Sequence, residues 1–172
     1  MDISVIKGNS IRLKGKQVTF IVDPSKQMPK TASDAIILFG INSDIDVSRV
    51  TDFRIIIDGP GEYEVGGVKI SGTKTPKGTL YRFSIDDINI VLGSATDAKT
   101  EGFNICQIAI VNTANDVNES FITALEPKMV ILYGEKKVEL AKALGAESVA
   151  PVPKITITKD KLPEKMGITV LG

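Results

Sequence analysis

The stretch AIILFGINSDID, residues 35–46, joins five apolar residues to a polar loop that begins at Gly40. The apolar run predicts a buried strand, and loops that follow buried strands usually carry the functional groups of α/β proteins. In a metal-dependent hydrolase this loop would supply histidines and carboxylates, because divalent metals need nitrogen or oxygen ligands that converge on one point. It offers one useful carboxylate, Asp44, and no histidine. The loop is therefore either an unusual site or the remnant of one.

The composition is that of an ordinary globular protein. The chain has 172 residues, 42% of them hydrophobic, so we expect one domain over residues 1–172 whose core needs no disulfide. Its 21 basic and 21 acidic residues cancel, which gives no overall attraction to nucleic acid or to an anionic membrane. The complete absence of histidine argues against imidazole acid–base catalysis and against most zinc sites.

The sequence also bears on location. No apolar run approaches the roughly 18 residues needed to span a bilayer, and the first ten residues lack the features of a secretion signal. We therefore expect a cytoplasmic protein without membrane contact. The single cysteine, Cys106, excludes an internal disulfide, and its apolar surroundings predict a buried structural thiol.

The first half reads as a series of short strands separated by turn residues. Asp86-Asp87 predicts a tight hairpin turn, and we expect antiparallel meander pairing throughout this half. The expected strands are Ile3–Lys7, Ile11–Leu13, Thr19–Val22, Ala35–Phe39, Phe53–Ile57, Val68–Ser71, Tyr81–Ile85 and Ile88–Leu92.

The second half alternates strands with helices. A helix capped by Asp116, with Glu119 three residues on, should end before Pro127. A second helix is expected over Glu135–Leu144, with Val138, Leu140, Ala141 and Leu144 turned inward. The remaining strands are Cys106–Val111, Met129–Tyr133, Ile155–Thr158 and Ile168–Leu171. Strands first and alternation later predict an α/β sandwich with two sheets inside and helices outside.

Two acidic or glycine-rich stretches allow a structural and a functional interpretation. Asp44 and Asp46 could hold a hard cation, but Asp46 also suits the cap of a short helix, which we favour. Residues 59–67, GPGEYEVGG, predict a tight corner between strands rather than a site built on Glu62 or Glu64. No nucleotide-binding glycine fingerprint and no serine nucleophile elbow is present.

A series of landmarks resembles the metallo-β-lactamase superfamily, in particular its small cytoplasmic bacterial branch of zinc-dependent hydrolases related to ascorbate-6-phosphate lactonase-like proteins. The landmarks occur in the family's order and cover nearly the whole chain. They are Gly8-Asn9-Ser10, Asp23-Pro24, Asp34-Ala35-Ile36, Gly40 to Ile45, Gly59 to Glu64, Leu92-Gly93-Ser94, Glu126 to Ile131 and Leu162-Pro163. The resemblance implies a compact, shortened αββα sandwich with two mixed β-sheets and outer helices.

The resemblance also implies where the family's metal ligands would fall. Its histidines correspond to Gly40, Asn42, Ile45 and a position on or beside Gly134, its bridging aspartate corresponds to Ser94, and only Asp44 matches as a ligand. A further histidine has no counterpart in residues 73–78. We therefore expect no zinc and no other cofactor, because catalytic zinc needs about three protein ligands.

These observations favour a catalytically inactive metallo-β-lactamase-fold protein that acts as a binding, regulatory or oligomer-forming module. Its partner would be another protein or a second copy of itself. An alternative is a hydrolase of phosphodiester, lactone or similar ester bonds, which would use a weak oxygen-ligand metal site or other polar groups, among them Asn42, Asp44, Ser94 and Tyr133. Nucleic-acid binding through the lysines of residues 154–165 is a weaker alternative, because Asp160 and Glu164 interleave with them.

Overall fold

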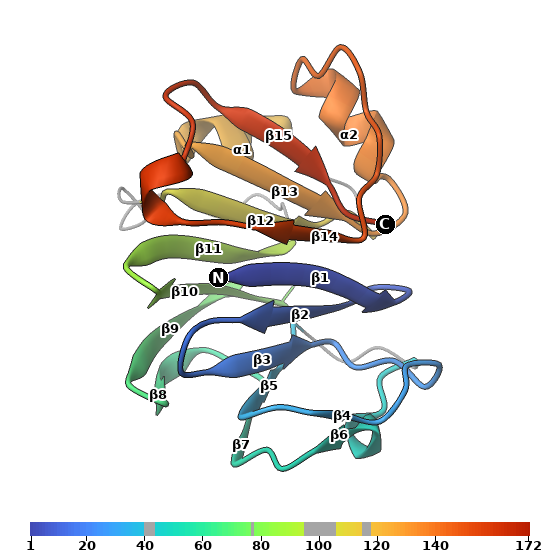
Figure 1. Ribbon diagram of the computed structural model, residues 1–172, viewed down its shortest axis with the longest axis vertical. Coiled ribbons are helices and arrows are strands. Elements are labelled where there is room, and N and C mark those ends of the chain that lie inside the picture. The colour runs from blue at the N-terminus through green and yellow to red at the C-terminus, as the bar shows by residue number, and fades with distance from the viewer. Residues whose placement is uncertain (40–43, 77, 95–105, 115–117) are drawn as a thin grey trace.

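The computed structural model describes residues 1–39, 44–76, 78–94, 106–114 and 118–172. In these residues two β-sheets stack face to face, and Figure 1 shows them as two layers. The first sheet has the strand order β14-β1-β2-β3-β5-β7 and the second has the order β15-β13-β12-β11-β10-β9-β8. Both sheets contain parallel and antiparallel pairs, so the predicted sandwich of two mixed sheets is confirmed.

The strand bounds follow the apolar runs of the sequence closely. The first sheet consists of β1 (Asp2–Lys7), β2 (Ser10–Lys14), β3 (Thr19–Val22), β5 (Ala35–Ile37), β7 (Ile55–Ile57) and β14 (Lys154–Thr156). The second consists of β8 (Gly61–Val65), β9 (Val68–Thr75), β10 (Gly78–Ile85), β11 (Ile88–Ser94), β12 (Ile108–Asn112), β13 (Met129–Tyr133) and β15 (Gly167–Val170). A small parallel pair, β4 (Thr31–Ala32) and β6 (Val50–Thr51), lies apart from both sheets.

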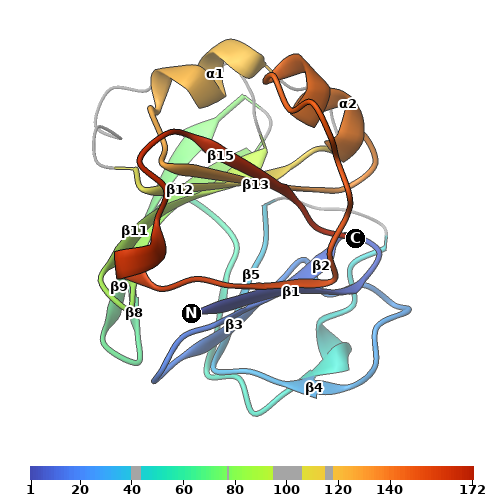
Figure 2. The ribbon, with the colours of Figure 1, turned by 45° about the horizontal axis from the view of Figure 1, so that its top comes forward.

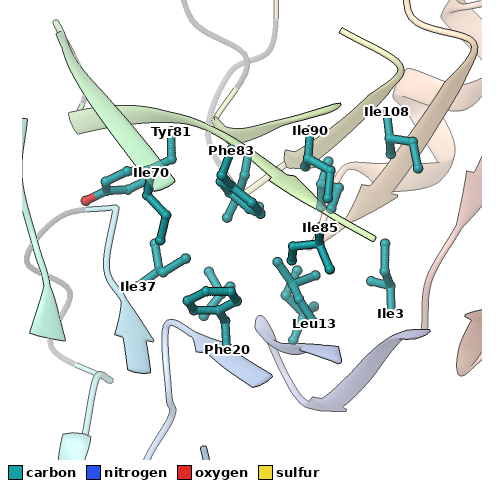
Figure 3. Close-up of a cluster of buried hydrophobic side chains, with 14 of the residues drawn as sticks. Ile3, Leu13, Phe20, Ile37, Ile70, Tyr81, Phe83, Ile85, Ile90 and Ile108 are labelled. Carbon is teal, nitrogen blue, oxygen red and sulfur yellow. The ribbon is translucent and has the colours of Figure 1, made fainter. Parts of the chain in front are cut away.

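Alternate residues of each strand point into the space between the sheets, because strand side chains have a period of two. The resulting core is rich in isoleucine and phenylalanine, and Figure 3 shows Phe20 and Ile37 of the first sheet opposite Ile70 and Phe83 of the second. The Phe20 and Phe83 rings lie 6.0 Å apart in a tilted arrangement. This inter-sheet layer is the main apolar core of the protein.

In the described residues, both α-helices cover the outer face of the second sheet (Figure 2). Helix α1 (Glu119–Ala124) buries Phe121 and Ile122 against that face, and α2 (Lys137–Ala143) buries Leu140 and Ala141 there. The outer face of the first sheet is covered instead by the β4–β6 pair and by the 3-10 helix η1 (Val47–Arg49). A second 3-10 helix, η2 (Lys159–Lys161), connects β14 to β15.

The structure corrects the expected meander of the first half. Strands β3, β5 and β7 pair in parallel, because residues 24–34 and 38–54 carry the chain back before each new strand starts. Antiparallel pairing holds for β1–β3 and for β8–β11, and Asp86-Asp87 forms the predicted hairpin turn with φ of 51° and 62°.

Residues 59–67 do not form a single corner either. Gly61–Val65 is the edge strand β8, and only Gly66-Gly67, with φ of 56° and 79°, makes the tight turn into β9. On this edge the Glu62 carboxylate accepts a 2.7 Å hydrogen bond from Ser71.

Details of the second half also differ from expectation. The cap of α1 is Asn118, whose side chain accepts a hydrogen bond from the Ser120 N–H, whereas Asp116 lies outside the described residues. Val138 was expected to face inward but is exposed, because Leu140 and Ala141 form the buried stripe of α2. Cys106 is buried as predicted, and burial raises the pKa of its thiol to about 12. No helix within the described ranges is long and apolar enough to cross a bilayer.

Candidate functional site at the carboxyl ends of the strands

The candidate site lies where several parallel strands of both sheets end. Strands β11, β12 and β13 pair in parallel in register, so that Ser94, Asn112 and Tyr133 are consecutive partners across the sheet. In each strand the residue two positions earlier is buried on the inner face, for example Ile110 before Asn112 and Ile131 before Tyr133. Because strand side chains alternate between the two faces, all three polar side chains lie on the inner face. The second sheet therefore ends in a row of three polar side chains, which we call the polar row.

Asp23 approaches the polar row from the first sheet. It follows β3 with a φ of 45°, a left-handed conformation that aspartate tolerates better than most residues. Its Oδ1 accepts a 3.2 Å hydrogen bond from the Phe39 N–H, and its negative charge acts on both Tyr81 and Tyr133. Loss of solvation raises the pKa of the carboxyl to about 7, although the residue keeps some exposed surface. Asp23 therefore changes protonation near neutral pH.

The turn that carries Asp23 is held by a buried serine. The Ser10 hydroxyl donates a 2.7 Å hydrogen bond to the Asp23 carbonyl and accepts one of 2.8 Å from the Ser25 N–H. Ser10 is fully buried, so both backbone groups depend on it rather than on water. The Pro24 carbonyl in turn accepts a 2.7 Å hydrogen bond from the Asp46 N–H, which ties this turn to the loop that follows β5.

Tyr81 connects the two sheets beside Asp23. Its hydroxyl donates a 2.8 Å hydrogen bond to the Leu38 carbonyl, just after β5, and burial raises its pKa. Figure 3 shows the Tyr81 oxygen directed away from the apolar core. Tyr133 is completely buried as well, and burial followed by the Asp23 charge raises its pKa well above the ordinary value. The neighbouring Asn112 amide opposes that rise.

Tyr133 and Asn112 differ in how their polar atoms are satisfied. Asn112 Oδ1 accepts a 2.9 Å hydrogen bond from the Ala114 N–H. The Tyr133 hydroxyl has no partner at hydrogen-bond geometry among the described residues, although the Asn112 amide is close enough to act on its pKa.

The residues expected from the loop after β5 are only partly described. Gly40 and Asn42 lie outside the described residues. Asp44 is exposed, and its carbonyl accepts a 3.0 Å hydrogen bond from the Lys26 N–H, while Ile45 forms an isolated bridge with Ser25. Asp46 caps η1 as favoured, accepting hydrogen bonds from the Ser48 N–H and hydroxyl, and these bonds lower its pKa.

Gly134 follows Tyr133 in a conformation that no other residue adopts easily. Its φ is 103°, and a Cβ added there would lie 3.0 to 3.1 Å from Thr113 Oγ1 and from the backbone nitrogens of Thr113 and Ala114. The Thr113 hydroxyl and N–H both donate to the Tyr133 carbonyl at 2.8 Å. A histidine side chain at this position would meet both strain and crowding.

The donor set of the described residues does not fit zinc. Within the ranges that the structure describes, no group of three histidine, cysteine, aspartate or glutamate side chains converges on a point. The whole sequence has no histidine, and Ser94, Ile45 and Gly134 supply no imidazole or carboxylate. Hydroxyl and amide oxygens of this kind suit weak binding of hard cations at best.

Comparison with solved structures identifies the architecture. A proposed Zn-dependent hydrolase of the metallo-β-lactamase superfamily from Thermotoga maritima superposes with a TM-score of 0.76 at 20% identity, covering 99% of both chains. The chain has the metallo-β-lactamase fold. A proposed metal-dependent hydrolase from Parabacteroides distasonis shares this fold, with a TM-score of 0.63, 18% identity and coverage of 99% and 93%. An isothiocyanate hydrolase from Delia radicum gut bacteria also matches, with a TM-score of 0.66, 14% identity and coverage of 92% and 100%.

No family model and no curated protein matches the sequence itself. The fold is therefore established by structure, while the chemistry has to be argued from the residues. Of the predicted positions, Ser94 and Gly134 lie at the polar row, together with Tyr133. Asp23 and Asn112 were not expected as site residues. A polar residue directly after an apolar strand, as in Asp23-Pro24 and Asn112-Thr113, is the signal that could have indicated both.

Proposed function

We propose that this protein uses the metallo-β-lactamase fold without zinc chemistry, as a binding, regulatory or oligomer-forming module. The observation that carries the proposal is the absence of histidine from all 172 residues. Imidazole is the nitrogen ligand that catalytic zinc sites most often use, and this chain cannot supply it. The neutral side chains of the polar row support the same view. The proposal also includes a cytoplasmic location and one domain over residues 1–172. Its partner would be another protein or a second copy of this chain.

Metal analysis of untagged protein tests this proposal. We expect less than a tenth of an equivalent of zinc after purification, and no rise in melting temperature when zinc is added. The Asp44→Ala variant should behave like the parent in both measurements, because Asp44 alone cannot hold the ion. Asp58→Ala, which removes an exposed aspartate, is the matched control. A full equivalent of zinc that Asp44→Ala loses and Asp58→Ala retains would contradict the proposal.

A second candidate is a hydrolase of ester-type bonds with a weak oxygen-ligand metal site or none. It is favoured by the presence of Asp23, Ser94, Asn112 and Tyr133 at one edge of the sandwich, where protonatable and hydrogen-bonding groups gather. Phosphodiester, lactone and thioester substrates, assayed with and without magnesium, test it. Turnover that is lost in Asp23→Ala but kept in Asp58→Ala would favour this candidate over the first.

A further inference from the structure

The Tyr133 hydroxyl is an unusual feature of the inter-sheet core. The residue is completely buried, and its oxygen has no hydrogen-bond partner among the described residues. Burying such a hydroxyl without a partner costs free energy that a phenylalanine of the same shape would avoid. This hydroxyl therefore gains an acceptor for its proton if a polar atom of a ligand reaches it.

The groups around this hydroxyl determine which kind of ligand atom it can bind. Asn112 uses its carbonyl oxygen on the Ala114 N–H, and its amide acts on the Tyr133 hydroxyl, whose own proton still lacks an acceptor. The Ser94 hydroxyl, two strands away in the same register, is partly exposed. Asp23 has one oxygen engaged by the Phe39 N–H, and its other oxygen donates when the carboxyl is protonated. The free groups are therefore mainly donors.

We propose that Tyr133, Asn112, Ser94 and Asp23 form a binding site for the carboxylate group of a small organic acid, with the Tyr133 hydroxyl as its central donor. The proposal rests on the proposed zinc-free function, because a metal ion at this edge would compete for the same oxygens. A carboxylate fits better than a phosphate ester, since the row offers neutral donors and contains no lysine or arginine.

Binding of a carboxylate should be linked to proton uptake. The ionisable groups that act on one another here are Asp23, Tyr81 and Tyr133, with Asp58 and Tyr63 acting on Tyr81. An ionised Asp23 would repel a second carboxylate, whereas a protonated Asp23 would donate to it. Because burial brings the pKa of Asp23 to about 7, affinity should fall about tenfold for each pH unit above that value.

Acetate is the probe for the experiment. We would titrate ¹⁵N-labelled protein with sodium acetate at pH 6 and pH 8.5, with sodium chloride at the same ionic strength as the reference. Saturable shifts of the Asn112 side-chain amide and the Phe39 backbone amide are expected, with affinity at least tenfold weaker at pH 8.5. Tyr133→Phe should fold, be at least as stable as the parent, and lose this binding at least tenfold. Tyr63→Phe, which removes a hydroxyl bonded to the Gly59 carbonyl, is the control that keeps it.

Each other outcome contradicts the inference. If acetate causes no saturable shift at pH 6, the site does not bind carboxylates. If Tyr133→Phe is clearly less stable than the parent, the hydroxyl already has an internal partner. Phosphate binding more tightly than acetate would assign the row to a different anion. The zinc measurement is made on separate samples, so failure of acetate binding in zinc-free protein overturns this inference alone.

Discussion

Asp23 and Phe39 are joined directly, because Asp23 Oδ1 accepts a 3.2 Å hydrogen bond from the Phe39 N–H. This bond links the residues that follow β3 and β5, two parallel neighbours of the first sheet. Burial of the carboxyl raises its pKa from 3.8 to about 7, although the Phe39 hydrogen bond acts in the opposite direction. The folded protein therefore keeps a proton on Asp23 over a pH range in which the unfolded chain has released it.

Stability should consequently fall as the pH rises from about 4 to about 7, and then level off. The folded state binds more protons than the unfolded state in this range, so deprotonation favours unfolding. The difference between 3.8 and about 7 corresponds to at most about 4 kcal/mol, and to less because the residue is partly exposed. Asp23→Asn should remove this slope and be more stable than the parent at pH 8.

Urea unfolding at several pH values measures this effect. Asp58→Asn, an exposed substitution, should retain the slope of the parent. The opposite result would be a free energy of unfolding that rises between pH 5 and pH 8 in the parent and does not rise in Asp23→Asn. It would show that the Asp23 carboxyl is charged in the native state.

Ser10→Ala should destabilise the turn that carries Asp23. The substitution leaves the Asp23 carbonyl and the Ser25 N–H without their common partner in a buried place. We expect a loss of about 1–3 kcal/mol in the free energy of unfolding. Ser71→Ala removes an exposed hydroxyl bonded to Glu62 and should cost less than about 0.5 kcal/mol. Equal effects of the two substitutions would show that Ser10 is not a structural anchor.

Gly134→Ala should be destabilising for two reasons that a control can separate. The φ of 103° strains any side chain, and the new Cβ would crowd Thr113 and Ala114. Gly145 has a similar φ of 92° but nothing within 4 Å of an added Cβ, so Gly145→Ala reports strain alone. We expect Gly145→Ala to cost about 1–2 kcal/mol and Gly134→Ala more, by thermal or urea unfolding. A smaller loss at Gly134 would mean that the β12 and β13 ends move apart readily.

Phe20→Ala tests the inter-sheet core. Phe20 is completely buried and packs on Phe83. Its truncation should reduce the free energy of unfolding by about 3–5 kcal/mol, while Phe20→Leu should cost clearly less because it fills more of the space. Similar losses for both variants would indicate that aromatic contact, rather than cavity volume, dominates at this position.

The sequence predicted those parts of the fold that depend on local pattern. Apolar runs such as Ala35–Phe39, the turn at Asp86-Asp87 and the cap at Asp46 all follow from side-chain periodicity and hydrogen bonding within a few residues. Strand direction did not follow, because parallel pairing of β3, β5 and β7 depends on the path of long connections. The sheet to which β14 and β15 belong did not follow from the pattern either, because these strands are close in sequence but join different sheets.

The site was harder to predict than the fold. Ser94, Gly134 and Tyr133 were named from the resemblance and from residue type, and they do lie at one edge. Asp23 acquires its raised pKa only from burial by distant segments, and Asn112 becomes relevant only through its register with Tyr133. Neither property is encoded within a few residues of the side chain concerned.

The pairing of β1 with β14 has a consequence for biosynthesis. Asp2 lies opposite Thr156 and Ile3 opposite Ile155, so the outer neighbour of the first strand is made more than 150 positions later. Until the ribosome has released that segment, β1 presents an unpaired edge that can join a strand of another nascent chain. Such distant pairing also slows folding. Yield in the cell should therefore depend on how quickly translation reaches β14 and on chaperones that shield the waiting edge.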